Sequence, residues 1–134
     1  MQYPIFIHKD HDSDYGVIVP DLPGCFSAGN SVAEAIQNAH EAIECHLEGL
    51  LADNQTIPLR KSLEEHINNP DFAGGVLALI DVNFSKISDK TIQIRVSFPE
   101  LFLKQIDDYV HRQGADLSQF LIDAAESYMS EHPV

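Results

Sequence analysis

Apolar and polar side chains alternate strictly over residues 90–96, which is the clearest pattern in the chain. One face of this segment carries the apolar side chains Ile92, Ile94 and Val96. The other face carries the polar side chains Thr91, Gln93 and Arg95. A period of two predicts a β-strand with one apolar face, and the two amphipathic helical patterns that follow offer it no partner strand. Since its backbone groups need hydrogen-bond partners, we expect this strand to pair with the same strand of a second chain.

The polar face of such a two-stranded ribbon carries side chains that can read base pairs. A ribbon of this width fits the major groove of DNA. There, Gln93 can bond adenine, Arg95 can bond guanine, and Thr91 can contact either base edge or a thymine methyl. We therefore predict a homodimer that binds DNA through these three residues.

The two predicted C-terminal helices add a candidate phosphate site. Pro99 stands at the start of the first helix, where proline is tolerated. Asp116 is a suitable N-cap for the second helix, with Gln119 three residues later. The backbone amides of Leu117 and Ser118 would then point out of the helix start, where a DNA phosphate can bind.

The apolar positions of this C-terminal segment predict a core that two chains share. We expect the dimer core to contain Ile92, Ile94, Val96, Tyr109, Phe120 and Leu121. The same pattern also fits an ordinary α/β fragment that packs on the rest of the chain, and this alternative stays open.

Shorter patterns in residues 1–84 predict a second structural unit. Three short strands are expected at residues 3–8, 15–20 and 25–29. Ser31 with Glu34 three residues later forms a capping box, which predicts the start of a long amphipathic helix that ends near Asp53. Residues 55–75 are polar with at most a short helix, and the apolar run 76–82 fits a buried strand.

Together these patterns predict an α+β protein with two domains. Residues 1–84 form a β-β-β-α-β domain, residues 85–89 form a polar linker, and residues 90–134 form a β-α-α domain. The length of 134 residues allows two small domains of this kind.

The net charge of −13 at pH 7 is distributed unevenly between these domains. Residues 1–84 hold 3 basic and 13 acidic residues, a charge of −10, whereas residues 85–134 hold 5 basic and 8 acidic residues, a charge of −3. Nucleic-acid-binding surfaces are normally basic, so we do not expect the N-terminal domain to contact DNA. Its acidity favours a basic protein partner, although it also fits a surface that is merely well solvated.

No pattern of catalytic or metal-binding residues stands out. The acidic turn at residues 10–14 resembles a calcium loop, but the following glycine is misplaced and the flanks are strand-like. The histidines, His8 and His11 among them, lack the paired spacing of a zinc site, and Cys25 and Cys45 fit reduced thiols. We therefore expect no enzyme, no cofactor and no metal. No membrane span or signal peptide is visible, so we expect a cytoplasmic chain.

Two segments resemble known families. Residues 90–131 resemble a ribbon-helix-helix domain in their alternating strand, the turn Gly114…Asp116-x-Ser118, and the apolar helix start Phe120-Leu121. Residues 15–29 read Tyr-Gly-Val-Ile-Val-Pro-Asp-Leu-Pro-Gly-Cys-Phe-Ser-Ala-Gly, and a helix start Ser-Val-Ala-Glu-Ala-Ile-Gln-Asn-Ala follows. This run resembles the N-terminal domain of HicB antitoxins, and the two resemblances together leave only about residues 55–75 uncovered.

The resemblance implies a partial ribonuclease H-like fold for residues 1–84 and a DNA-binding module in residues 90–134. Further association of the predicted dimers through the N-terminal domain would give a tetramer that spans two half-sites. It also implies that the chain neutralises a small basic ribonuclease toxin, HicA, and represses the operon that encodes both proteins. Two other functions stay open, a ribonuclease H-like metal-dependent nuclease and a repressor without a protein partner. We expect no catalysis, because the carboxylates that such a nuclease needs at strand ends are not recognisable.

Overall fold

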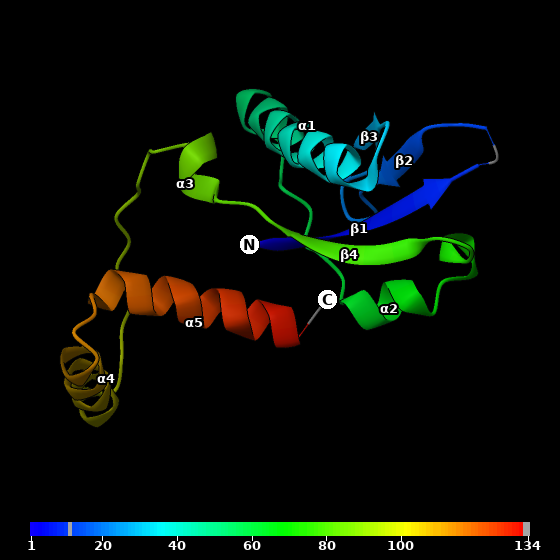
Figure 1. Ribbon diagram of the computed structural model, residues 1–134. Helices are drawn as coiled ribbons and strands as arrows, with labels where there is room; N and C mark the ends of the chain where they lie inside the picture. The colour runs from blue at the N-terminus through cyan, green and yellow to red at the C-terminus, as the bar shows by residue number, and fades with distance from the viewer. Residues whose placement is uncertain (11, 133–134) are drawn as a thin grey trace. The chain divides into compact units, whose positions relative to one another are not determined.

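The computed structural model describes residues 1–10 and 12–132. The chain divides into two compact units, Met1–Asp89 and Lys90–His132. The first unit contains a four-stranded sheet with helices, and the second contains two helices (Figure 1). The predicted α+β class is therefore confirmed, while the ribonuclease H-like and ribbon-helix-helix assignments stay predictions.

The sheet of the first unit is antiparallel throughout. Its strands are β1 (Gln2–Lys9), β2 (Tyr15–Ile18), β3 (Phe26–Gly29) and β4 (Val76–Asp81). They lie in the order β3-β2-β1-β4, so that β1 is an inner strand between β2 and β4.

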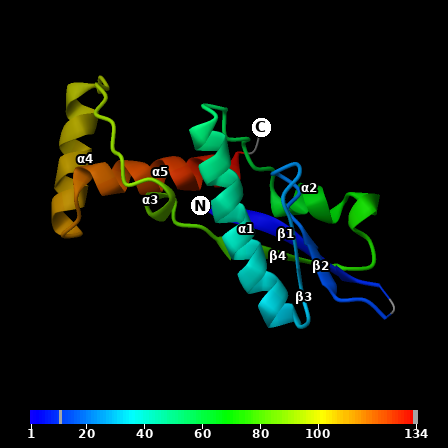
Figure 2. The same ribbon diagram turned by 90° about the horizontal axis from the view of Figure 1, so that it is seen from above.

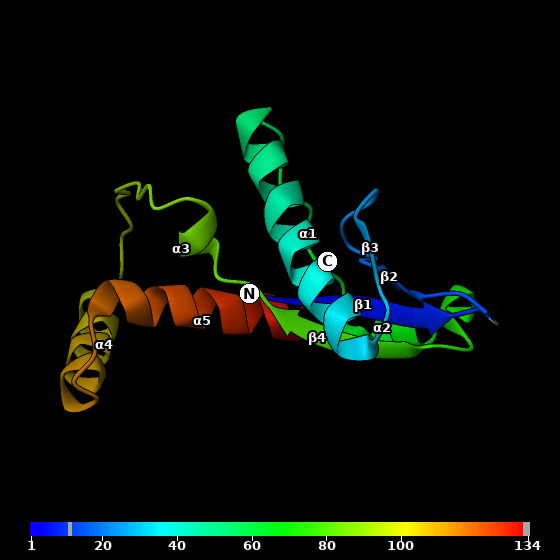
Figure 3. The same ribbon diagram turned by 45° about the horizontal axis from the view of Figure 1, so that its top comes forward.

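One long helix, α1 (Val32–Ala52), covers one face of this sheet and crosses the strands at an angle (Figures 2 and 3). The Ser31 hydroxyl caps it by accepting a hydrogen bond from the Glu34 amide at 3.1 Å, as the capping box predicts. The helix ends at Ala52 with Asp53 as its C-cap, and Asn54 then takes a left-handed conformation with φ of 53°. Its fully buried stripe packs on the sheet and consists of Ala35, Ala39, Ile43 and Leu47.

The opposite face of the sheet is covered by α2 (Leu63–Ile67) and the short 3₁₀ helix η1 (Pro70–Phe72). Successive residues of a strand point to opposite faces, so Tyr3, Ile5 and Ile7 join the core under α1. Phe6 points the other way, and its ring lies 5.1 Å from the ring of Phe72. β1 is therefore buried on both faces.

Pro4 lies in this inner strand, where a missing amide would normally cost a ladder hydrogen bond. The amide of Val82 donates to the carbonyl of Met1 at 2.8 Å, and because hydrogen-bonded pairs alternate, Pro4 and its neighbour Leu79 form a non-hydrogen-bonded pair. The nitrogen of Pro4 thus faces the β2 side, where the ladder begins only at Phe6. Proline therefore costs the sheet no hydrogen bond at this position.

β4 forms one edge of the sheet, since β1 is its only partner strand among the described residues. Val76 and Leu79 are 63% and 42% exposed, whereas Ile80 and Val82 are buried. The expectation of a buried strand over residues 76–82 is therefore wrong for its outer positions. An apolar run does not reveal how many neighbours its strand will have, because neighbours depend on the topology of the whole sheet.

The first unit ends in a short helix, α3 (Phe84–Ile87). The Asn83 side chain caps it by accepting from the Ser85 amide at 3.0 Å, and Ile87 packs against the core of the unit. The predicted linker at residues 85–89 is thus helical over its first part. The composition of residues 85–89 did not indicate a helix, because Ile87 is the only apolar residue among them.

The second unit contains α4 (Glu100–Arg112) and α5 (Leu117–Glu131), which run in clearly different directions (Figure 2). Pro99 directly precedes α4 as its N-cap residue. Residues 90–98 form neither helix nor strand within the single chain. The strand predicted at residues 90–96 was expected to pair with another chain, so it stays a prediction.

Candidate functional site

The second unit buries very little of its apolar surface by itself. Only Ile106 and Val110 are buried among residues 90–132. A unit this small normally needs a well-filled core or a partner to stay folded. Nine of its large apolar side chains are exposed, namely Ile92, Ile94, Val96, Leu101, Phe102, Tyr109, Ile122, Tyr128 and Met129.

The segment 90–96 is exposed on both of its faces in the single chain. Ile94 is 79% exposed, and Ile92 and Val96 are exposed as well. The three predicted base-reading residues are also exposed, as base contacts require: Thr91, Gln93 and Arg95. The apolar face is thus available to a partner while the polar face is available to a ligand.

An apolar groove of about 640 Å³ lies between α4 and α5. It is lined mainly by Phe98, Phe102, Ile106, Tyr109, Phe120 and Leu121. The rings of Tyr109 and Phe120 lie 5.6 Å apart. The structure therefore brings together three of the predicted dimer-core residues, Tyr109, Phe120 and Leu121, while the other three lie on the segment 90–96.

The turn between α4 and α5 places the predicted phosphate-binding amides at a helix start. The Asp116 carboxylate accepts from the Gln119 amide at 3.4 Å, and the Asp116 carbonyl accepts from Phe120. The amides of Leu117 and Ser118 belong to the first turn, where an α-helix offers no internal acceptor. They are therefore available to an anion, although the Asp116 carboxylate opposes its charge.

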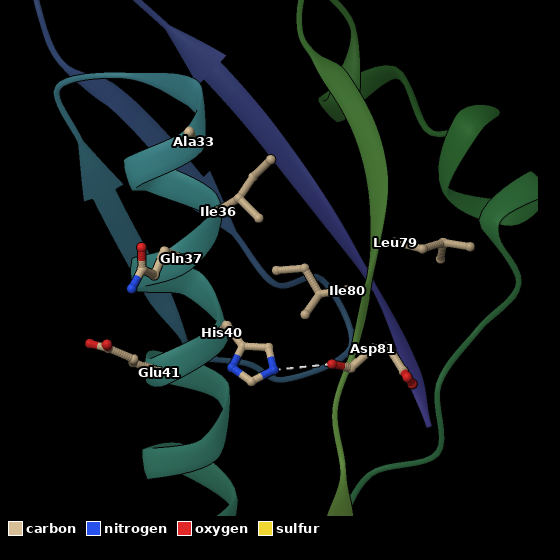
Figure 4. A pocket seen from close by; sticks show the side chains of 8 residues that line it. All are labelled: Ala33, Ile36, Gln37, His40, Glu41, Leu79, Ile80 and Asp81. Atoms are coloured by element: carbon tan, nitrogen blue, oxygen red, sulfur yellow. Dashed lines mark hydrogen bonds between the residues drawn. The ribbon is translucent and has the colours of Figure 1, made fainter.

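A cleft of about 460 Å³ lies in the first unit between α1 and β4 (Figure 4). His40 bridges these elements, since its Nε2 atom lies 3.1 Å from the Asp81 carbonyl and its Nδ1 atom lies 3.1 Å from the Glu44 carboxylate. Ile36 and Ile80 form the apolar floor, and Glu41 stands on the exposed side of α1 (Figure 4). The motifs that we analysed in the sequence did not indicate this cleft.

A buried hydrogen-bonded pair joins the turn after β2 to α2. The Nε2 atom of His66 lies 3.0 Å from Oδ1 of Asp21, and both side chains are at least nine-tenths buried. Oδ2 of Asp21 has no hydrogen-bond partner. Because Asp21 is sequestered in this pair, it is not a free carboxylate for metal binding.

Two further ionisable groups of the core have shifted pKa values. Burial and the nearby Asp21 carboxylate raise the pKa of Tyr3 to about 12, with Arg60 acting in the opposite direction. Burial, with a smaller contribution from Cys45, raises the pKa of the Cys25 thiol. Both shifts favour the neutral side chain and fit a structural role.

Within residues 1–10 and 12–132, no group of three or more His, Cys, Asp or Glu side chains could hold a metal ion. His11, which we weighed as a zinc ligand, lies outside the described residues. None of the helices in the described part of the chain has the length and apolarity to span a membrane.

Comparisons with known proteins identify the family. A family model described as HicB_like antitoxin of bacterial toxin-antitoxin system matches residues 3–125. A 14.9 kDa protein from the rep–hol intergenic region of Haemophilus phage HP1 is 39% identical over 127 residues, covering 93% of this chain and 95% of the relative.

Solved structures agree with this match. The antitoxin HicB of Burkholderia pseudomallei superposes with a TM-score of 0.73 at 40% identity, covering 93% of this chain and 96% of that one. A chain of the HicA3 and HicB3 toxin–antitoxin complex superposes with a TM-score of 0.55 at 35% identity, covering 62% of this chain and 99% of that one. The chain therefore belongs to the HicB-like antitoxins of bacterial toxin–antitoxin systems.

Proposed function

We propose that this antitoxin binds and inhibits a small basic HicA-like ribonuclease that cleaves mRNA, and that it represses its own operon by binding operator DNA as a homodimer. Residues 1–84 bind the toxin, and residues 90–134 form the ribbon-helix-helix dimer. The chain itself carries out no catalysis and acts in the cytoplasm, where both mRNA and operator DNA are found.

The observation that carries the DNA-binding part is the exposure of the segment 90–96 and its two faces. The exposed apolar side chains of Ile92, Ile94 and Val96 gain stability if a partner buries them. The apolar groove beside Tyr109 and Phe120 on a second copy offers a surface that can do so. Pairing of the two segments would satisfy their backbone groups and leave Gln93 and Arg95 facing outward. A tetramer would let the protein span two half-sites.

The acidic first unit supports the toxin-binding part. Its charge of −10 favours the capture of a basic protein. The HicB3 relative has been solved in complex with a toxin, HicA3, which supports a partner of the same kind for this chain.

Three measurements on the full-length chain test this function. Gel-shift titration should show specific binding to DNA from upstream of its own gene, and light scattering should show a dimer or tetramer at micromolar concentration. Addition of the chain should also block RNA cleavage by the HicA-like protein encoded beside it. A monomer that binds no DNA, or undiminished RNA cleavage, would contradict the corresponding part of the proposal.

A further inference from the structure

We infer that the free edge of β4, together with the cleft between β4 and α1, is the docking surface for the basic toxin, which adds a strand of its own to the sheet. This inference rests on the proposed function and names the surface that performs the toxin-binding part of it. Two features of the first unit support it, an unpaired strand edge and the carboxylates of Glu41 and Asp81 on either side of that edge.

The backbone of β4 presents unpaired hydrogen-bonding groups on its outer edge at Leu77 and Leu79, whereas the outward carbonyl of Asp81 already has His40 as its partner. Residues that pair with β1 through hydrogen bonds alternate with residues that do not. Since the Val82 amide bonds to Met1, the alternation directs the amides and carbonyls of Leu77 and Leu79 away from β1. Among the described residues no strand pairs with this side of β4.

This edge lacks the usual protection against pairing with another strand. Natural edge strands carry lysine, proline or a bulge, or they are very short. β4 has six residues, reads Val-Leu-Ala-Leu-Ile-Asp, and leaves Val76 and Leu79 exposed. An edge of this kind is a template for an added strand, a common mode of peptide recognition.

The cleft makes the surface selective for a basic partner. It lies along β4 on the side of α1, while Leu79 projects to the other side of the strand (Figure 4). Glu41 lines the cleft from α1, and the Asp81 carboxylate is 78% exposed. An added strand would direct alternate side chains to the two faces of β4, where Glu41 lies on the α1 side and the Asp81 carboxylate, which also pairs with the Met1 amine at 3.4 Å, lies on the side of Leu79.

Charge also decides between a toxin and a second copy of this chain as the occupant. The first unit carries a charge of −10, so two such units brought edge to edge would repel each other. A basic protein meets the same surface with complementary charge. We therefore assign the edge to the toxin.

Backbone chemistry allows a sharp test in the full-length chain. Leu79→Pro removes one outward amide and leaves the β1 ladder intact, because Leu79 sits in a non-hydrogen-bonded pair. The matched control is Ala28→Pro on β3. Gly16 and Ala28 also form a non-hydrogen-bonded pair, because Val19 bonds to Cys25 at the end of the same ladder. Leu79→Pro should weaken binding to the HicA-like toxin about tenfold or more, and Ala28→Pro should not.

A second pair of variants keeps the test independent of folding. Glu41→Lys reverses a charge in the cleft, while Glu48→Lys makes the same change elsewhere on α1, so both variants have the same net charge. Glu41→Lys should weaken toxin binding about tenfold, and Glu48→Lys should weaken it far less. Equal effects of the two variants would reduce the interaction to net charge and overturn the assigned surface.

Hydrogen exchange gives a direct view of the pairing. On addition of the toxin, the amides of Leu77 and Leu79 should exchange at least about tenfold more slowly, and those of Phe26 and Ala28 on the other edge should not. Toxin that is bound and inhibited without protection of Leu77 and Leu79 would overturn the docking surface but not the proposed function. Toxin that does not bind the unchanged chain would overturn both. A lowered oligomeric mass for Leu79→Pro with intact toxin binding would assign the edge to a second copy and overturn the inference.

Discussion

The Nε2 atom of His66 donates a hydrogen bond to Oδ1 of Asp21 over 3.0 Å, although 45 positions separate the two residues in the chain. The contact fastens α2 to the turn that follows β2. Both side chains are withdrawn from water, so each depends on the other for its hydrogen bonding.

Replacement of His66 by phenylalanine should destabilise the first unit. His66→Phe leaves the Asp21 carboxylate buried without any partner, which should lower the free energy of unfolding by about 1–3 kcal/mol. Urea denaturation followed by circular dichroism measures this change. Glu64→Gln on the exposed side of α2 is the control and should stay within about 0.5 kcal/mol of the unchanged chain. Equal stabilities of all three proteins would show that the pair contributes nothing.

Two glycines of the first unit should respond in opposite ways to alanine. A Cβ atom at Gly29 would overlap the Ala35 amide nitrogen at the start of α1, whereas nothing lies within 4 Å of one at Gly49. Gly29→Ala should therefore cost about 1–3 kcal/mol of stability. Gly49→Ala should add about 0.5–1 kcal/mol, because alanine favours the helix. Thermal denaturation of the two variants checks both signs, and a stabilising Gly29→Ala would contradict the close approach.

The raised pKa of Tyr3 predicts a loss of stability in alkali. Its value rises from 10.0 to about 12 in the folded chain because of burial and Asp21. As the pH rises, the Tyr3 phenol ionises in the unfolded chain at a lower pH than in the folded chain. The stability that Tyr3 contributes through this shift is therefore complete below pH 10 and is lost as the pH rises towards 12. Unfolding free energies measured across this range should fall less steeply for Tyr3→Phe than for the unchanged chain. If the free energy of unfolding falls equally steeply with pH in both proteins, the pKa of Tyr3 is not raised by folding.

Two substitutions on the polar face of residues 90–96 test base reading. Arg95→Ala and Gln93→Ala should each cost about 1–3 kcal/mol of operator binding if they contact guanine and adenine edges. Both residues are exposed, so the stability should change by less than about 0.5 kcal/mol. Ile94→Ala is the contrasting variant, because it removes a dimer-core side chain and should cost roughly 2–5 kcal/mol of stability. If both alanine variants remain dimeric and bind the operator with unchanged affinity, the ribbon-helix-helix assignment loses its main support.

Backbone amides at the start of α5 can be tested separately from side chains. Leu117→Pro removes an amide at the first helical position, where proline is tolerated. Binding to operator and to unrelated DNA should weaken alike, by about 0.5–1.5 kcal/mol, because phosphate contacts carry no sequence information. Ser118→Ala keeps its amide and should bind as before. A loss of affinity for the operator alone would argue against a phosphate contact.

The local elements of the fold follow from the sequence because their signals are local. The Ser31 cap, the end of α1 near Asp53 and the Asp116 cap are all formed as predicted. The edge position of β4 could not be predicted in this way. It depends on which strands lie beside it, and the same apolar run fits an inner or an outer strand.

The candidate sites show the same difference between local and long-range signals. Exposure of Gln93 and Arg95 is consistent with the period-two pattern, which already separated the two faces. The Asp21–His66 pair and the His40 bridge join residues that are far apart in the chain, so neither produces a pattern in the sequence. Long-range polar contacts of this kind need coordinates.

The small core of the second unit links the lifetime of this chain to its concentration. With only Ile106 and Val110 buried, residues 90–132 have little free energy of folding of their own and gain the rest from whatever covers Leu101, Tyr109 and their neighbours. If the proposed dimer covers these side chains, dilution should separate its two copies, and the second unit should then open more often than the sheet of residues 1–89. Proteases cleave such open segments first, so a fall in concentration speeds the removal of the remaining molecules.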